Sequence, residues 1–270
     1  MTVRTCTKVN IGLNVLRRRP DGYHDLETLF VPYWGLGDVL EVEPADELSI
    51  VIERDGGVDW DPMEDLTVRA WQLLKARFPS LPSVSIRLQK GAPVGAGLGG
   101  GSADAAFMLR ALNELGGLEL PDSDLAAYAA KIGSDCAFFV YCRPMFGSGR
   151  GEILEPFDID LSGYDLRVEI PVDASGSPVA VSTKEAYSGI VPREANGRSD
   201  GHAPVGGATL REALKLPVEG WRGVVVNDFE ATVCQLHPEI PALIQDFYRR
   251  GAVYAAMSGS GASVFGLFRK

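Results

Sequence analysis

A glycine-rich segment ending near residue 101 has the composition of an anion-binding loop. Residues 93–106 read PVGAGLGGGSADAA and contain five glycines, all placed before an expected helix. Glycines let the backbone approach an anion closely and adopt positive φ angles. A helix N-terminus adds unpaired N–H groups and about half a positive charge. The segment therefore predicts a binding site for a polyphosphate.

Two familiar phosphate motifs fit this segment poorly. Gly95, Gly97 and Gly100 satisfy G-x-G-x-x-G, but no strand pattern leads to an acidic residue roughly 20 residues later, as a dinucleotide-binding fold requires. A P-loop ends in Gly-Lys-Ser/Thr, and no lysine follows Gly101. A plain tight turn stays open as an alternative, because glycine clusters also build such turns.

Two interpretations are open for the polar residues at the start of the expected helix. Ser102 either caps the helix or directs its hydroxyl toward a magnesium ion, and Asp104 either favours the helix dipole or lies near that metal. Capping is the interpretation that we favour for both. No protein ligand of a metal is predicted.

Hydrophobic periodicity predicts the elements that position this segment. A strand is expected over 84–88 and a helix from about 102 to 115, so the glycines connect a strand to a helix. The other expected elements of the first half are a hairpin of strands at 9–15 and 26–32 with a turn at 17–22, strands within 39–52, a helix over 66–78 capped by Asp65, and a helix over 125–132 capped within 122–124 and ending at Gly133.

The pattern breaks at residues 147–155, and we place a domain boundary there. The predicted domains are 1–153, which contains the glycine-rich segment, and 154–270. The second domain is expected to contain strands at 166–171, 179–182, 252–257 and 263–268, helices at 229–236 and 238–250 with Gly251 as C-cap, and a mobile surface loop at 192–207.

Composition excludes several classes of protein. The net charge of −10 over 270 residues argues against a protein that grips nucleic acid or an anionic membrane. The four cysteines lack Cys-x-x-Cys spacing, and with three histidines they form no zinc pattern, so we expect buried free thiols. The N-terminus shows no signal-peptide pattern and no stretch is apolar enough to span a bilayer, which makes the cytoplasm the expected location.

Short motifs along nearly the whole chain resemble those of the GHMP kinases (galactokinase, homoserine kinase, mevalonate kinase and relatives). Gly97-Leu98-Gly99 followed by Ser102-Ala103 resembles their phosphate-binding motif, and the turn at 258–263 resembles their C-terminal glycine-rich motif. Four further motifs resemble a subfamily that phosphorylates a cytidine-diphosphate polyol in the non-mevalonate isoprenoid route. They are Lys8-Val9-Asn10, Asp21 to Thr28, Ile132 to Asp135, and Asn227 to Glu230.

The resemblance implies an α+β, two-domain GHMP kinase fold with the active site in the inter-domain cleft. It also implies ATP with Mg²⁺ as cosubstrate and the 2-hydroxyl of the polyol as acceptor. The nucleotide would be bound by Pro93, Val94, Gly95, Ala96, Gly97, Leu98, Gly99, Gly100, Gly101, Ser102 and Ala103. Two features depart from the subfamily, which often has Pro-Ala at Cys6-Thr7 and a small or apolar residue at Arg150.

The same resemblance assigns catalytic roles to Lys8 and Asp135. Asp135 would accept the proton of the acceptor hydroxyl, and Lys8 would pair with Asp135, hold it ionised and neutralise charge on the γ-phosphoryl group. Asn10, on the same face of the strand as Lys8, would orient the acceptor. Two alternatives are open: Asp135 as an ordinary N-cap, and Lys8 as a solvated lysine of an edge strand.

Further residues are implied in binding the acceptor. Tyr23 would stack on the cytidine base, His24 would hydrogen-bond its edge, and Thr183 and Tyr187 would add a hydroxyl and an aromatic platform. Gly259, Ser260 and Gly261 would close on the phosphates of the acceptor. The alternatives are hairpin packing for Tyr23, a loop imidazole for His24, a helix N-cap for Thr183 and a tight β-turn for 258–263. For Arg17, Arg18 and Arg19 we favour a solvated hairpin tip over a contact with the diphosphate.

Three rival functions compete with this hypothesis. The nearest is another GHMP kinase that acts on mevalonate, homoserine or a sugar, from which residues 21–28 distinguish this chain. A non-catalytic nucleotide-binding protein of the same fold is disfavoured because Lys8 and Asp135 are both present. A dinucleotide-dependent oxidoreductase is disfavoured because the acidic strand end is missing.

Overall fold

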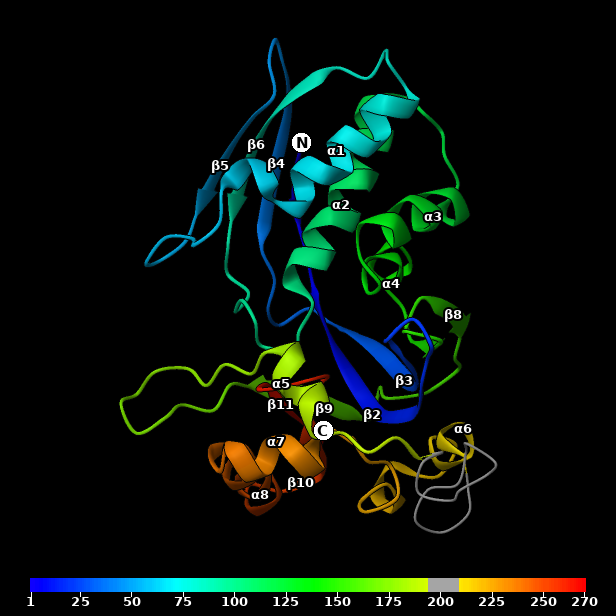
Figure 1. The fold of residues 1–270 in the computed structure, drawn as a ribbon, viewed down its shortest axis with the longest axis vertical. Helices are drawn as coiled ribbons and strands as arrows, with labels where there is room; N and C mark the ends of the chain where they lie inside the picture. The colour runs from blue at the N-terminus through cyan, green and yellow to red at the C-terminus, as the bar shows by residue number, and fades with distance from the viewer. Residues whose placement is uncertain (194–208) are drawn as a thin grey trace. The chain divides into compact units, whose positions relative to one another are not determined.

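Two structural units, each discontinuous in sequence, form the residues 1–193 and 209–270 that this computed structural model describes (Figure 1). The first unit comprises Met1–Lys8, Pro32–Val94 and Gly99–Arg143. The second comprises Val9–Val31, Gly95–Leu98 and Pro144–Lys270. The predicted domains, 1–153 and 154–270, are each contiguous in sequence, unlike these two units. Their boundary stays a prediction.

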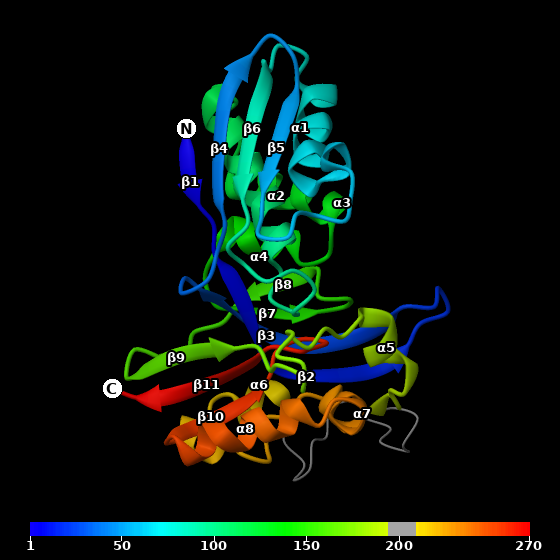
Figure 2. The same ribbon diagram turned by 90° about the vertical axis from the view of Figure 1, so that its left-hand side faces the viewer.

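The first unit packs helices on one face of a four-stranded sheet, which lies in front of them in Figure 2. The strand order is β1-β4-β6-β5, and only the β5–β6 pair is parallel. In β6, Val84, Ile86 and Leu88 are buried while the residues between them are exposed, as the alternation predicted. The elements are β1 (Thr2–Arg4), β4 (Val39–Ala45), β5 (Ser49–Glu53), η1 (Pro62–Glu64), α1 (Leu66–Arg77), β6 (Ser83–Gln89), α2 (Gly100–Leu115), α3 (Asp122–Ile132) and α4 (Cys136–Tyr141).

The second unit contains two antiparallel sheets, of order β2-β3-β7-β8 and β10-β11-β9. Its core joins α8 to the second sheet through Ile240, Ile244 and Phe247, which repeat at the helical period. The elements are β2 (Thr7–Arg18), β3 (His24–Tyr33), β7 (Met145–Ser148), β8 (Ile153–Pro156), β9 (Tyr164–Glu169), α5 (Thr183–Ser188), α6 (Leu210–Ala213), η3 (Val218–Gly220), α7 (Glu230–Leu236), α8 (Glu239–Arg249), β10 (Ala252–Met257) and β11 (Val264–Arg269).

Most predicted elements are confirmed, including the N-terminal hairpin, the strand before the glycines and the C-terminal strand pair. The Asp65 cap is also confirmed, because its carboxylate accepts a hydrogen bond from the Thr67 amide at 2.9 Å. Cys6 and Cys136 are buried free thiols, whereas the free thiols Cys142 and Cys234 are only half-buried. Among the described residues, no helix combines the length and the apolar character that a membrane span needs.

Four details of the prediction are wrong. Helix α3 begins at Asp122, so the acidic residues expected as caps lie in its first turn and Pro121 precedes them. Residues 147–155 include parts of β7 and β8, and residues 179–182 form no strand. Helix α8 ends at the C-cap Arg250, one residue before Gly251. The loop expected at 192–207 lies almost entirely outside the described residues.

Candidate active site

The N-terminus of α2 leaves its first amides unbonded by any capping side chain within the described structure. Gly99 occupies the N-cap position with φ 73° and ψ 23°, and it has no side chain that could accept from the first turn. The amides of Gly100, Gly101 and Ser102 come before the first intrahelical bond, which runs from the Ala103 N–H to the Gly99 carbonyl at 2.9 Å. The predicted capping role of Ser102 is therefore wrong, and the helix start instead offers donors to an anion.

Gly99 also brings the helix start into contact with Lys8. A Cβ atom at Gly99 would lie 3.0 Å from the Phe139 ring and 3.3 Å from Cε of Lys8. Only glycine fits this position, because it supplies the left-handed conformation and leaves room for both neighbours. The lysine stem consequently runs beside the first turn of α2.

Lys8 and Asp135 form the predicted ion pair. The Lys8 Nζ and the Asp135 Oδ2 are 3.5 Å apart, and the two side chains are 5% and 33% exposed. Burial lowers the pKa of the Lys8 ammonium, and the Asp135 carboxylate opposes that shift. Asp135 stands at the N-cap of α4 but makes no capping hydrogen bond, which argues against the alternative of an ordinary cap. Lys8 is likewise no solvated surface lysine.

Ser102 links the start of α2 to the residue after Asp135. Burial raises the pKa of the Cys136 thiol to about 11, and a hydrogen bond with the Ser102 side chain opposes the rise. The first unit thus gathers three features in one place: the open amides of α2, a buried cation, and a partly exposed carboxylate.

Asp104 does not take its predicted capping role, because the first turn of α2 contains no acidic residue. It is 1% exposed, and its Oδ2 lies 2.6 Å from the Nζ of Lys90. Within residues 1–193 and 209–270, no group of three or more His, Cys, Asp or Glu residues could hold a metal ion. A magnesium ion that arrives with a nucleotide needs few protein ligands, because phosphates and water supply most of its coordination.

In the second unit, the two glycine-rich segments contact each other. A Cβ atom at Gly97 would lie 2.7 Å from the Ser258 carbonyl oxygen, and the Ser263 hydroxyl donates to the Ala96 carbonyl at 2.6 Å. Gly259 and Gly261 adopt φ 58° and 97° in this turn. Ser260 lies between these glycines.

Asn10 and Asn227 support the turn at 258–263 through hydrogen bonds. The buried Asn10 donates through its backbone N–H to the Ser258 hydroxyl at 3.1 Å and through Nδ2 to the Thr28 hydroxyl at 3.1 Å. Asn227 donates through Nδ2 to the carbonyls of Met257 at 2.9 Å and Gly259 at 2.8 Å. This support by Asn227 was not predicted, although the residue lies in a motif that the sequence singled out.

His24 and Tyr187 stack on each other at the edge of a hollow of about 840 Å³. Their ring centroids are 4.8 Å apart at an interplanar angle of 24°, and Arg18 and Lys184 also line the hollow. Burial, and then the charge of Arg18, lower the pKa of His24, which favours the neutral imidazole that can both donate and accept a hydrogen bond.

The remaining predicted residues of the acceptor site are exposed. Tyr23 is 57% exposed, and the Arg150 guanidinium lies over its ring, 4.8 Å from the centroid. Thr183 is exposed in the first turn of α5, where the N-cap is Ser182, so the alternative of Thr183 as an N-cap is wrong. Arg17 and Arg19 are both engaged with Asp25 at the hairpin tip.

Comparison with known proteins identifies the family. A Bacteroides fragilis protein named 4-diphosphocytidyl-2-C-methyl-D-erythritol kinase is 45% identical over 264 residues, which cover 97% of this chain and 89% of the relative. The chain belongs to the GHMP kinase family. Models described as the GHMP kinases N terminal domain and C terminal match residues 65–143 and 217–270 of this GHMP kinase.

Other relatives and solved structures support the same family assignment for this GHMP kinase. A protein of the same name from Azobacteroides pseudotrichonymphae is 42% identical, over 97% of this chain and 91% of the relative. A crystal structure of 4-(cytidine 5'-diphospho)-2C-methyl-D-erythritol kinase matches with a TM-score of 0.74 at 32% identity, over 99% and 90% of the two chains. Homoserine kinase from Cytophaga hutchinsonii, with a TM-score of 0.67 at 16% identity, shares the fold. The predicted α+β GHMP kinase fold is confirmed.

Proposed function

We propose that this chain is an ATP-dependent kinase that phosphorylates the 2-hydroxyl of 4-diphosphocytidyl-2-C-methyl-D-erythritol, a step of the non-mevalonate route to isoprenoid precursors. The observation that carries the proposal is the Lys8–Asp135 pair beside the open amides of α2. The names of the relatives at 42–45% identity support the choice of acceptor.

The start of α2 would bind the triphosphate of MgATP. The amides of Gly100, Gly101 and Ser102 point along the helix axis, where the dipole favours negative charge. A neighbouring ammonium adds to this, because phosphoryl transfer depends mostly on positioning and on neutralising charge. Lys8 would therefore stabilise the γ-phosphoryl group as it transfers, and the approach of phosphate would reverse the pKa depression that burial causes.

Asp135 would accept the proton of the attacking hydroxyl. Its carboxylate is the partly exposed member of the pair, so a substrate hydroxyl can reach it while Lys8 stays buried. Proton acceptance by a positioned side chain typically contributes about 10²–10⁴-fold to rate.

The acceptor's nucleoside would be recognised by aromatic and polar groups of the second unit. We assign the base to the hollow of His24 and Tyr187, with Thr183 nearby in sequence and Tyr23 on the hairpin tip. Asn10 and the turn at 258–263 would hold the acceptor's polyol and phosphates. The net charge of −10 fits an enzyme of the cytoplasm whose partners are small molecules rather than nucleic acid or membranes.

Release of ADP from MgATP tests the proposal with four acceptors: the cytidine-diphosphate polyol, mevalonate, homoserine and galactose. We expect turnover with the first alone, and Asp135→Asn to lower kcat by at least about 100-fold while calorimetry shows unchanged nucleotide binding. Asp124→Asn, an exposed aspartate of α3, is the matched control and should leave kcat unchanged. Turnover of another acceptor would make this a different GHMP kinase, and nucleotide binding without any turnover would make it a non-catalytic relative.

A further inference from the structure

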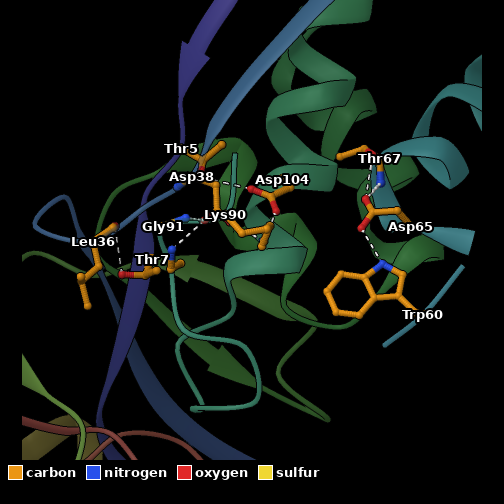
Figure 3. Close-up of polar contacts among 11 residues, drawn as sticks. Thr5, Thr7, Leu36, Asp38, Trp60, Asp65, Thr67, Lys90, Gly91 and Asp104 are labelled. Carbon is orange, nitrogen blue, oxygen red and sulfur yellow. Dashed lines mark hydrogen bonds and ion pairs between the residues drawn. The ribbon is translucent and has the colours of Figure 1, made fainter. Parts of the chain in front are cut away.

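A buried network of three ionisable side chains lies beside the entry to the glycine-rich segment (Figure 3). Lys90 Nζ donates to the Oδ2 atoms of both Asp38 and Asp104, the latter at 2.6 Å. The side chains of Lys90, Asp38 and Asp104 are 4%, 0% and 1% exposed. All three belong to the first unit, and the proposed reaction gives none of them a role.

The network joins the two ends of the segment that precedes α2. Asp38 Oδ1 accepts from the amides of Gly91 and Ala92, each at 2.7 Å, so it fixes the backbone where the chain leaves β6. Asp104 lies in α2 itself, one turn after the helix start. The Lys90 side chain contacts both Asp38 and Asp104, and it therefore ties the entry of the segment to its exit.

The same network also supports the first residue of α2. A Cβ atom at Gly100 would lie 3.2 Å from the Ala92 Cβ, 3.7 Å from the Asp38 Oδ2 and 4.0 Å from the Lys90 Nζ. The ammonium and the Asp38 carboxyl group therefore lie next to the residue that carries the first open amide. Precise placement of such donors is what electrostatic stabilisation of phosphate requires.

Stability alone is a weak explanation for this arrangement. Buried ion clusters are often no more stabilising than well-packed apolar residues, because each ion loses its hydration. Burial, together with the charge of Asp38, raises the pKa of Asp104 to about 8, so placing two carboxyl groups beside one ammonium carries a clear cost. Supporting residues that lock the geometry of a binding site are, in contrast, a common reason for buried polar groups near such a site.

We propose that Lys90 is a positioning residue for nucleotide binding, which acts through Asp38 and Asp104 to hold the first turn of α2 in the conformation that accepts phosphate. The inference rests on the proposed function, since it takes the α2 amides as the phosphate site. Removing the ammonium should therefore weaken MgATP binding more than it weakens acceptor binding.

The test compares Lys90→Met with the double variant Lys90→Met/Asp104→Asn, in which only one of the two buried aspartates can still ionise without the ammonium. Calorimetry measures the Kd of a non-hydrolysable ATP analogue with Mg²⁺ in the absence of acceptor, and thermal unfolding measures stability. We expect both variants to bind the analogue about 10–100-fold more weakly, the range found when residues that support the ligands of a metal site are lost. The double variant should regain much of the thermal stability that the single variant loses.

Two further readouts separate positioning from general damage. The KM of the acceptor should stay within about twofold, and amide hydrogen exchange in residues 89–103 should rise in both variants. Arg87→Met is the matched control, because Arg87 lies in β6, the strand that Lys90 directly follows, and pairs with Glu53 at an exposed site; it should change neither readout.

Wild-type affinity for the analogue in the double variant would overturn this inference, and so would a rise in the acceptor KM as large as the loss of analogue affinity. Either result would leave the proposed function standing. A wild-type chain that fails to bind the analogue would overturn the proposed function and, with it, this inference.

Discussion

Substituting alanine for Gly99 tests whether the start of α2 is fitted tightly against Lys8. Gly99 has φ 73°, and a Cβ there would meet the Phe139 ring at 3.0 Å and the Lys8 Cε at 3.3 Å. Gly117, at the other end of the same helix, has φ 56° with nothing within 4 Å of a Cβ. Gly117→Ala therefore serves as a control that has the backbone strain without the contacts.

The two substitutions should differ in stability by the energy of the contacts. An alanine forced into the left-handed region costs about 1–2 kcal/mol, and this term applies to both variants. Overpacking a well-filled site costs about a further 1–3 kcal/mol, and this term applies to Gly99→Ala alone. We expect a loss of about 2–5 kcal/mol for Gly99→Ala and of about 1–2 kcal/mol for Gly117→Ala.

Chemical denaturation followed by circular dichroism measures the stability, and ADP release measures the activity. Displacing Lys8 by a few tenths of an ångström to about 1 Å should lower kcat by up to about 100-fold in Gly99→Ala, because catalytic groups tolerate little misplacement. Gly117→Ala should keep wild-type kcat. Equal stability losses in the two variants, together with unchanged kcat in Gly99→Ala, would refute the tight fit and the role of Lys8 beside the helix start.

Three other substitutions have defined outcomes. Burial raises the pKa of Glu230 from 4.5 to about 7, so the stability that this residue contributes is full below pH 4.5 and is lost as the pH rises through 7. Between about pH 5 and about pH 8, the free energy of unfolding should therefore fall by up to about 3 kcal/mol more in wild type than in Glu230→Gln. Parallel pH profiles of the two proteins would contradict this. Asp65→Ala should destabilise the fold by about 1 kcal/mol in denaturant titrations, because the N-cap of α1 is lost, while no change would mean that the cap is redundant. Tyr187→Ala removes the ring stacked on His24 and should raise the acceptor KM by about tenfold while leaving the KM of MgATP unchanged. A rise in the KM of MgATP alone would show that the acceptor does not bind at this ring.

Local patterns in the sequence predicted most of the elements because their causes are local. Alternation in β6 and the cap at Asp65 depend on a few neighbouring residues, and both are confirmed. The start of α2 was placed two residues too late, because Gly100 and Gly101 have poor helix propensity and tertiary packing overrides it. Strands β7 and β8 were missed because the glycines between them read as a break in the pattern.

The candidate site was predictable only in part. The composition of the glycine-rich segment predicted a phosphate site. The pairing of Lys8 with Asp135, in contrast, was predicted from the resemblance to GHMP kinases, because no local pattern indicates it. Nothing in the sequence marks Lys90 or Asp38 as buried, since both are residue types of the surface. Their burial depends on contacts between segments more than 50 residues apart, which a single sequence does not display.

The alternation of the two units along the chain limits how this protein can be divided. A fragment ending at Arg143 would contain the whole first unit but would also carry Val9–Val31 and Gly95–Leu98 without the rest of the unit to which they belong. Its complement would lack the hairpin that completes the sheet of β7 and β8. Separate expression of the halves should therefore give aggregation-prone pieces rather than two small soluble proteins. Because β2 passes from one unit to the other at Lys8 and Val9, proteolysis within that one strand should unfold both.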